Sequence, residues 1–192
     1  MHPARAFRSD ADPLDQAAVT GFAHVFAGTP EAPMVVHAPV TRHGASLRFH
    51  VARANRIARH LDGAIVLLSV VGPQGYISPN WYERPGDQVP TWNYVAVEID
   101  GQAAPVGDDD LVEHLDALAA NHEPHDRPWT RDKMDDALFR RMLGGIRGFG
   151  VTVAATRTTD KRSQNKSDAD RAGVIAGLDR EGNVALAAAM RA

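Results

Sequence analysis

The sequence predicts an α+β fold in which a β-rich centre lies between helical segments. Apolar residues recur at helical spacing near the start of the chain and again over about residues 108–144. Between these stretches, short runs of β-forming residues alternate with Gly, Pro and polar clusters. Closely spaced short strands of this kind are typical of an antiparallel barrel or sandwich.

The first predicted element is an amphipathic helix. Asp12 followed by Pro13 is typical of an N-cap and a first helical position, and the apolar spacing continues through Phe26 until Gly28 ends it. The β-rich centre follows, with strands predicted at Met34–Val40, Ser46–Val51, Ala64–Val71, Tyr76–Ser78, Tyr94–Ile99 and Gln102–Val106.

Helical spacing then returns twice. One helix is predicted from Leu111 to Ala119, and a second runs from Met134 to Met142, with Thr130 as its candidate cap and Gly144 at its end. The chain closes with a strand over Ile146–Ala155, a polar stretch over Arg157–Asp170 and an Ala-rich helix over Val184–Met190.

Length and composition indicate one globular domain. A chain of 192 residues can bury about 70% of its extended surface in a single core. Its 44% hydrophobic and 23% charged residues are near the averages of globular proteins, which argues against wholesale disorder and against a membrane protein. We therefore expect a single domain over residues 1–192, with a helical insertion over about 108–144 and a C-terminal segment over about 157–192.

Charge and cysteine content exclude several classes of site. The net charge of -3 gives no overall attraction to nucleic acid, so any contact with DNA requires a local basic patch. The absence of cysteine excludes disulfides, thiolate metal sites and a thiol nucleophile. Residues 1–26 lack the apolar run of a signal peptide, and the longest apolar run, Ala64–Val71, is too short to span a membrane. The cytoplasm is the expected location.

An arginine cluster is the first candidate for ligand binding. Four arginines lie close together with no acid between them, giving a local charge of +4: Arg48, Arg53, Arg56 and Arg59. The planar fork of donors on arginine matches phosphate oxygens, and Asn55 adds a further donor. The alternative is a solvated, charged strand end, since charge runs usually face water.

Aromatic residues gather in two short segments. Gly72–Tyr82 and Val89–Tyr94 contain five of the six Trp and Tyr residues of the chain. Aromatic rings beside amides and hydroxyls suit a flat polar heterocycle, although Trp and Tyr can equally serve as core residues with a wet polar tip. The polar loop Lys161–Lys166 is consistent with anion or carbonyl recognition, and equally with a mobile surface loop.

Other chemistries have weaker support. His122 and His125 lie near Glu123 and Asp126, but Pro124 breaks the helix and the spacing matches no specific metal site, so no metal is predicted. A Gly-x-Ser-x-Gly elbow and a phosphate-binding Gly-x-Gly-x-x-Gly are both missing, which argues against a serine hydrolase and a Rossmann enzyme.

Four segments taken in order resemble the PaiB-type family of FMN-binding negative transcriptional regulators. They are His50-x-Ala-Arg53-x-Asn55, Tyr76-Ile-Ser-Pro-x-Trp-Tyr82, Val89-Pro-Thr-Trp-Asn-Tyr94 and Lys161-x-Ser-Gln-Asn165. The resemblance implies a six-stranded antiparallel split β-barrel of the pyridoxamine-phosphate-oxidase-like kind with flanking helices. It also implies a homodimer that binds FMN between its two subunits.

The resemblance assigns roles to eight residues. Arg53 and Asn55 are expected at the FMN phosphate. Ser78, Trp92 and Tyr94 are expected around the ribityl chain or the ring, and Lys161, Ser163 and Gln164 are expected to close the site.

Three functions follow from the resemblance. The first is a negative regulator of transcription, acting on DNA directly through the arginine cluster or indirectly through small-molecule chemistry. The second is an FMN-dependent oxidoreductase acting on a small molecule, because the same barrel hosts oxidases and reductases. The third is a flavin-binding dimer that acts only by contacting partner proteins. No helix-turn-helix pattern supports direct DNA binding.

Overall fold

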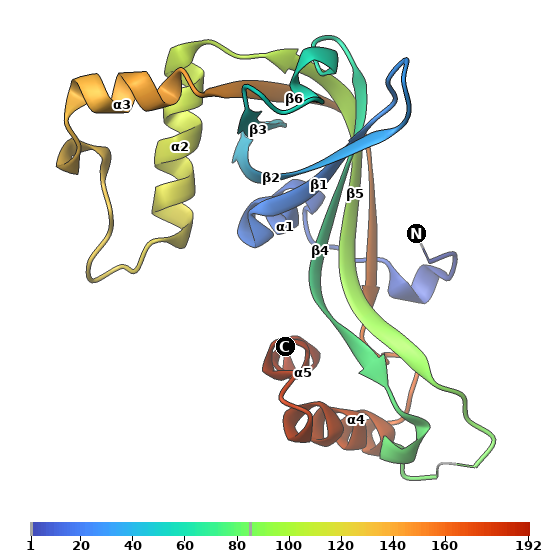
Figure 1. Ribbon diagram of the computed structural model, residues 1–192. Coiled ribbons are helices and arrows are strands. Elements are labelled where there is room, and N and C mark those ends of the chain that lie inside the picture. Colours follow the sequence, from blue (N-terminus) through green and yellow to red (C-terminus); the bar gives the residue numbers. More distant parts are fainter. Residues whose placement is uncertain (1, 85) are drawn as a thin grey trace. The chain divides into compact units, whose positions relative to one another are not determined.

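The computed structural model describes residues 2–84 and 86–192, and within them six strands form one closed barrel in the order β1-β2-β3-β6-β5-β4 (Figure 1). The strands are β1 (Phe22–Ala27), β2 (Met34–His43), β3 (Ser46–Ala52), β4 (Ile65–Ile77), β5 (Thr91–Pro105) and β6 (Ile146–Lys161). Strand pairs β1–β2, β1–β4, β2–β3 and β3–β6 are antiparallel. The predicted α+β fold with an antiparallel six-stranded barrel and flanking helices is confirmed.

Helices precede, interrupt and follow the strands. They are α1 (Pro13–Thr20), α2 (Asp108–His122), α3 (Asp136–Leu143), α4 (Asp168–Arg180) and α5 (Val184–Arg191). Single 3-10 turns lie at η1 (Arg5–Phe7), η2 (Ala58–His60), η3 (Pro79–Trp81) and η4 (Arg131–Lys133). Among the described residues no helix is long and apolar enough to cross a membrane.

The chain divides into two compact units. The barrel unit comprises Ala11–Val70 and Val97–Thr156, and the terminal unit comprises the residues up to Asp10, Val71–Ala96 and Arg157–Ala192. Strands β4, β5 and β6 each continue from one unit into the other. The expectation of a single domain over residues 1–192 stays a prediction.

Alternating side chains build the core of the barrel unit. In β1, Ala23, Val25 and Ala27 are buried while the residues between them face outward. Phe49 of β3 pairs in register with Phe149 of β6, and their rings stack with centroids 5.5 Å apart. Each such fully buried ring contributes about 1.5–3 kcal/mol through the hydrophobic effect.

The terminal unit has its own small core. Helices α4 and α5 pack together and bury Val174, Leu178, Leu186 and Met190. Helix α4 also packs on η3 so closely that Gly177 faces the Trp81 ring. Ser167 and Asn183 cap the two helices with side-chain oxygens, which satisfies backbone donors in their first turns.

The structure corrects several predicted boundaries. The opening helix ends at Thr20, because Gly21 takes a left-handed conformation with φ of 72°, and the residues after it form β1 instead of more helix. Residues 65–71 and 76–77 of two predicted strands lie in the single strand β4, and residues 94–99 and 102–105 of two others lie in β5.

Three further differences concern the second half of the chain. Strand β6 continues to Lys161, through the start of the stretch predicted to be a polar loop. Helix α4 was not predicted. The cap of α3 is Asp135, whose side chain accepts from the Leu138 amide, while Thr130 makes no side-chain cap. The predicted end of α3 at Gly144 is confirmed.

Candidate cofactor site

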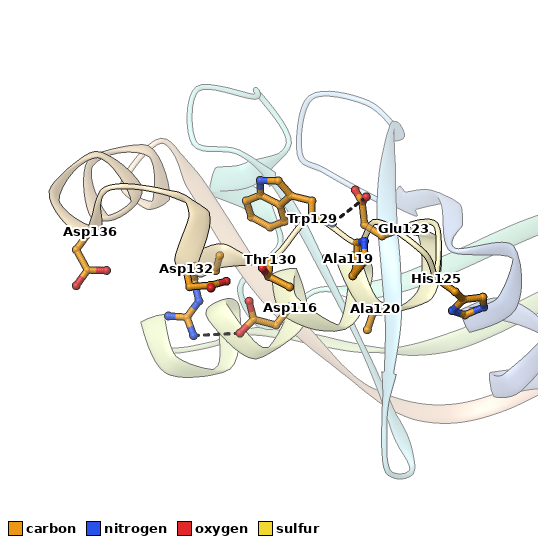
Figure 2. A pocket seen from close by; sticks show the side chains of 11 residues that line it. Asp116, Ala119, Ala120, Glu123, His125, Trp129, Thr130, Asp132 and Asp136 are labelled. Carbon is orange, nitrogen blue, oxygen red and sulfur yellow. Dashed lines mark hydrogen bonds and ion pairs between the residues drawn. The ribbon is translucent and has the colours of Figure 1, made fainter.

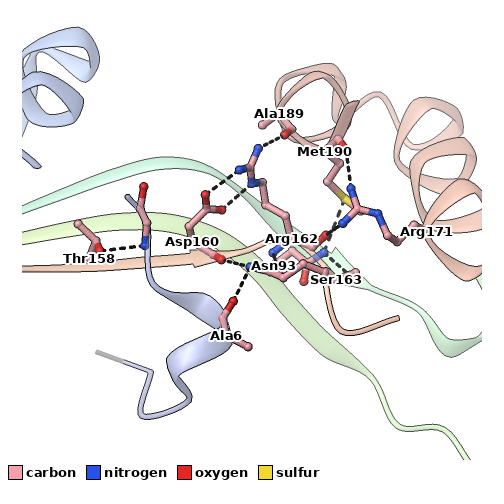
Figure 3. Close-up of polar contacts among 11 residues, drawn as sticks. Ala6, Asn93, Thr158, Asp160, Arg162, Ser163, Arg171, Ala189 and Met190 are labelled. Atoms are coloured by element: carbon pink, nitrogen blue, oxygen red, sulfur yellow. Dashed lines mark hydrogen bonds and ion pairs between the residues drawn. The ribbon is translucent and has the colours of Figure 1, made fainter. Parts of the chain in front are cut away.

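The loop after β6 lies against the first residues of β5 within the terminal unit. The Lys161 ammonium donates to Thr91 Oγ1 over 2.5 Å. The Asn93 amide donates to Ser163 Oγ over 2.8 Å, a contact that Figure 3 shows. Ser163 is buried and has a φ of 58°, a left-handed conformation that costs a non-glycine residue about 1–2 kcal/mol. The turn at Ser163 is therefore held by its contacts.

Hydrogen bonds of Gln164 and Arg162 hold the same loop, and Figure 3 shows Arg162 beside Asp160. The Gln164 amide donates to the carbonyls of Ala6 and Asp160, and its oxygen accepts from the Arg162 backbone amide over 2.7 Å. The Arg162 guanidinium binds the Asp160 carboxylate through two hydrogen bonds, of 2.5 and 2.7 Å. Both ends of the Gln164 amide are thus bonded to the protein itself. Its predicted role in closing the site would therefore come from holding the loop in place.

Lys161 has an altered protonation equilibrium. Burial lowers the pKa of its ammonium, because low-dielectric surroundings disfavour the charged form. The ammonium also lies 5.8 Å from the centroid of the Phe7 ring. A partly desolvated ammonium beside the Thr91 hydroxyl can bind an anionic or carbonyl oxygen, or exchange a proton with one.

The three other predicted residues of the terminal unit present an aromatic surface and a turn. The Trp92 ring is 47% exposed, donates to Gln74 Oε1 over 3.2 Å, and meets the Tyr76 ring edge-on at 6.4 Å. Tyr94 is half-buried on the same strand. Ser78 Oγ accepts from the Asn80 amide and so caps η3. The exposed Trp92 ring remains available to stack on a flat heterocycle.

Asn93 is a residue that the sequence interpretation did not single out. It is fully buried, and among the described residues its side-chain oxygen has no hydrogen-bond partner. A buried acceptor without a donor costs about 1–3 kcal/mol. The Asn93 oxygen could therefore accept a hydrogen bond from a bound ligand. Its place in the Val-Pro-Thr-Trp-Asn-Tyr motif was the available signal, since it faces the opposite side of the strand from Trp92 and Tyr94.

Arg53 and Asn55 belong to the barrel unit. The Arg53 guanidinium donates to the carbonyls of Gly144, over 2.7 Å, and Ile146, over 3.1 Å. Asn55 Oδ1 accepts from the Ile57 amide over 3.1 Å. Arg53 also lines a cavity of about 410 Å³. Arg140 and Asp109 lie in the same wall, so the cavity carries charges of both signs.

The rest of the arginine cluster is largely paired. Arg48 binds Asp110 over 2.6 Å and Glu113 over 2.8 Å, and Arg59 binds Glu31 over 2.5 Å. These carboxylates come from other parts of the chain, so the local charge of +4 seen in sequence is mostly neutralised in the fold. This pairing narrows the phosphate hypothesis to Arg53 and its exposed neighbour Arg56.

A buried polar network joins α2 to the barrel. His114, on α2, is almost fully buried; its Nδ1 lies 2.6 Å from Thr41 Oγ1 and its Nε2 lies 2.9 Å from His50 Nδ1. His43 Nε2 lies 2.9 Å from the same threonine oxygen. Burial, and then the charges of His50, His43 and Arg48, lower the pKa of His114 to about 3. The predicted site includes none of these residues.

Cavities elsewhere in the barrel unit contain none of the eight predicted residues. One of about 660 Å³ lies beside α2, with Trp129, Asp116 and Glu123 in its wall (Figure 2). An apolar cavity of about 560 Å³ shares these three residues. Within residues 2–84 and 86–192 no group of three or more His, Asp or Glu side chains could hold a metal ion.

Comparison with known proteins decides the family. A family model described as "Putative FMN-binding domain" matches residues 1–155, most of the chain. The chain belongs to this FMN-binding family. FMN as the predicted cofactor is thereby confirmed, and the unpaired Asn93 oxygen, the exposed Trp92 ring and the Lys161 ammonium are groups that such a cofactor can use.

Relatives support the family and the fold. The chain is 40% identical over 119 residues to the protease synthase and sporulation protein PAI 2 of Bacillus subtilis, which confirms the PaiB resemblance. That alignment covers 62% of this chain and spans 56% of the relative.

Two solved structures share the fold at 18% identity each. The FAD and heme binding protein from Mycobacterium smegmatis matches with a TM-score of 0.59, over 86% of this chain and 78% of its own. The flavocytochrome Anf3 from Azotobacter vinelandii matches with a TM-score of 0.61, over 89% and 78%.

Proposed function

We propose that this FMN-binding protein is a homodimeric negative regulator of the PaiB type, located in the cytoplasm. The 40% identity to the Bacillus subtilis protease synthase and sporulation protein carries this proposal. The alignment spans only 56% of the relative, so the regulatory activity is a proposal. FMN binding is supported separately, by the match to the family model.

The residues expected at the cofactor keep their proposed roles. Arg53 and Asn55 hold the phosphate, Ser78, Trp92 and Tyr94 surround the ribityl chain or ring, and Lys161, Ser163 and Gln164 close the site. When bound, FMN supplies redox chemistry that no side chain of the protein can provide. The protein orients the flavin and, at Lys161, holds or moves a proton.

Regulation through the flavin is favoured over direct DNA binding. Proteins that bind DNA present a basic surface to the phosphates. Here Arg48 and Arg59 are paired with carboxylates, so two of the four positive charges of the arginine cluster are neutralised, and only Arg53 and Arg56 remain for phosphates. The protein would then control expression indirectly, through a small molecule or a partner protein that senses the state of the flavin.

An FMN-dependent oxidoreductase is the second candidate, and Lys161 is the observation that favours it. Burial lowers the pKa of this ammonium, and general acids work best when their pKa lies near the working pH. The structural neighbours include a flavocytochrome, so redox proteins share this fold. Fold alone does not decide between the two candidates.

Two measurements test these proposals. Mass spectrometry of the purified protein should identify FMN, and a colourless protein that takes up no added FMN would contradict the cofactor. Band shifts on promoter DNA of the host should show no sequence preference if control is indirect. A salt-sensitive, sequence-selective shift would establish direct repression. Rapid flavin reduction by NAD(P)H, with turnover of a small-molecule acceptor, would favour the enzyme.

A further inference from the structure

Two adjacent cavities lie beside α2 and α3 in the barrel unit. One measures about 660 Å³ and the other about 560 Å³, and both have Asp116, Ala119, Glu123 and Trp129 in their walls. Protein cores are packed so closely that voids larger than a water molecule are few. Pockets that bind small molecules measure about 300–1,000 Å³. We call the pair the α2–α3 cavity; its two parts each have the size of a ligand site.

Apolar side chains from both helices line the smaller part. Helix α2 contributes Leu115 and Leu118, and α3 contributes Phe139 and Met142. Met142 is 60% exposed in the single chain, so protein covers the apolar side of α3 only in part. A ligand with an apolar or aromatic body would remove this surface from water, which is favourable in proportion to the area covered.

Carboxylates dominate the wall of the larger part. Asp116 pairs with Arg131, the one Lys or Arg residue of this wall, over 3.2 Å. Glu123 accepts from the Trp129 backbone amide over 3.1 Å (Figure 2). The other two acids of the wall, Asp132 and Asp136, form no ion pair with any residue that the structure describes. Four carboxylates thus face one guanidinium, and the wall is negative.

The negative charge of the whole chain is concentrated in the segment that forms this cavity. Residues 108–144 contain ten of the 24 Asp and Glu residues but only five of the 21 Lys and Arg residues, a net charge of -5. The rest of the chain has a net charge of +2. A cleft lined by one sign of charge raises the local concentration of ions of the opposite sign. This segment therefore attracts cations and repels anions.

We propose that the α2–α3 cavity binds a small amphipathic cation, a molecule with an aromatic or branched apolar body and an ammonium group. The apolar body fills the part lined by Leu115 and Met142, and the ammonium lies near the carboxylates of Asp132 and Asp136. Trp129 belongs to both parts, and its ring can stack on the apolar body or lie against the cation. This inference goes beyond the proposed function and does not depend on it.

Other occupants match these walls less well. FMN carries a phosphate that the carboxylates would repel, and none of the eight residues expected at the cofactor lines either part. A metal ion lacks ligands, since no group of three or more His, Asp or Glu side chains within residues 2–84 and 86–192 could hold one. A neutral apolar molecule would use one part only and leave the carboxylates of the other without a counter-ion.

Three naphthalene probes that differ mainly in charge test the proposal. They are the cation naphthylmethylammonium, the neutral naphthylmethanol and the anion naphthoate, each titrated calorimetrically into the full chain with bound FMN. The cation should bind at least about tenfold more tightly than the alcohol, because the carboxylates add attraction to an apolar contact that both probes make. The naphthoate should bind most weakly.

Removal of the unpaired carboxylates tests the charged part. The double variant Asp132→Asn, Asp136→Asn should weaken binding of the cation by about tenfold and leave the affinity for the alcohol unchanged. Asp126→Asn is the matched control, because Asp126 is an exposed acid of the same segment that lines neither part. It should change the affinity for either probe by less than about twofold, since exposed charges at a distance are screened.

Trp129→Ala tests the apolar contact. It should weaken the cation and the alcohol alike, by about fivefold or more, because both lose an aromatic contact. The bond to Glu123 uses the Trp129 backbone, so it is retained in this variant. Leu138→Ala is the control, because Leu138 is also 37% exposed and lines neither part, and it should change neither affinity.

Three outcomes would overturn the inference. The first is a cation that binds no more tightly than the alcohol, or that Asp126→Asn weakens as much as the double variant does. The second is displacement of the cation by FMN added to flavin-free protein, since the cavity would then belong to the cofactor site. The third is the absence of probe binding together with a lower mass of Trp129→Ala in light scattering, which would show that a second copy of the chain fills the cavity.

Discussion

The binding partners of single charged residues in this fold are set by tertiary contacts and not by their neighbours in the sequence. Arg48 and Arg53 are neighbours in an arginine cluster, yet one binds two carboxylates from α2 and the other binds two backbone carbonyls. The partners of Arg48 lie more than sixty positions away in the chain, so the sequence cannot reveal them. The same holds for Asn93, whose partners come from the loop after β6 and from α5.

Arg53 can be tested against another arginine of the same cluster, Arg59. If Arg53 holds the FMN phosphate, Arg53→Ala should weaken FMN binding by about 10- to 100-fold, because a charge-assisted hydrogen bond contributes a free energy of that size. The affinity for riboflavin, which has no phosphate, should be nearly unchanged. Arg59→Ala removes the same charge from an arginine that already pairs with Glu31 and is the control. Fluorescence titration of both ligands measures the effect, and equal weakening of the two would count against the phosphate role.

His114 makes the stability of the barrel unit depend on pH. Its folded pKa of about 3 lies below the unfolded value near 6.5, so the native state binds fewer protons in between. The stabilising effect of neutral His114 is therefore complete above pH 6.5 and is lost as the pH falls toward 3. The pKa values of His50 and His43 are lowered as well, chiefly by burial, which steepens the loss.

Urea unfolding at pH 7.5 and pH 5 measures this dependence. Below about pH 6.5 the natural protein should lose about 1.4 kcal/mol per pH unit for each histidine that stays neutral in the fold, and above it this loss should vanish. His114→Gln keeps a donor and an acceptor but cannot titrate in this range, so its loss should be smaller. The nearby charges of Arg48, Asp110 and Glu113 are unchanged in this variant, and an identical pH dependence would contradict the assignment.

Secondary-structure elements were predicted best where the pattern and the tertiary structure agree. The strands β2 and β3 and the helix α2 were recognised because periodicity and burial coincide there. The opening helix was extended too far because Phe22, Val25 and Phe26 also fit a helical spacing. Only pairing with β2 and β4 shows that these residues belong to a strand.

Helix α4 was missed for a related reason. It has little amphipathic pattern and contains two glycines, Gly173 and Gly177, which lower helix propensity. Tertiary packing explains both glycines. A Cβ on Gly173 would lie 2.0 Å from the Trp81 carbonyl oxygen, and one on Gly177 would lie 2.3 Å from the Trp81 ring. The helix can approach η3 only because these side chains are absent.

The Gly177 contact predicts a destabilising substitution. Gly177→Ala should lower the free energy of unfolding by about 1–3 kcal/mol, because overpacking against Trp81 outweighs the roughly 1 kcal/mol gain in helix propensity. Ala176→Ser is the control, since Ala176 is exposed on the same helix. Guanidinium unfolding measures both, and a stabilised Gly177→Ala protein would show that α4 does not pack this closely on η3.

At the scale of the whole molecule, the motif resemblance predicted more of the fold and the cofactor than periodicity did. The four ordered motifs implied an antiparallel split barrel and FMN, and the strand order and family match confirm both. Periodicity alone left a barrel and a sandwich open, because closure depends on pairing between β1 and β4, forty residues apart. Dimerisation and regulation involve other molecules. From the sequence they were predicted only through the family resemblance.

FMN binding should stabilise the folded chain by mass action. A ligand at 100 times its Kd that binds only the native state adds about 2.7 kcal/mol, which for a chain of this size corresponds to a Tm rise of about 5–10 °C. Riboflavin at the same concentration should raise the Tm less, because it lacks the phosphate that Arg53 is proposed to hold. Differential scanning fluorimetry on flavin-free protein measures both shifts. Equal shifts would mean that the protein recognises the ring alone, and the aromatic surface around Trp92 would then replace the arginine as the main source of affinity.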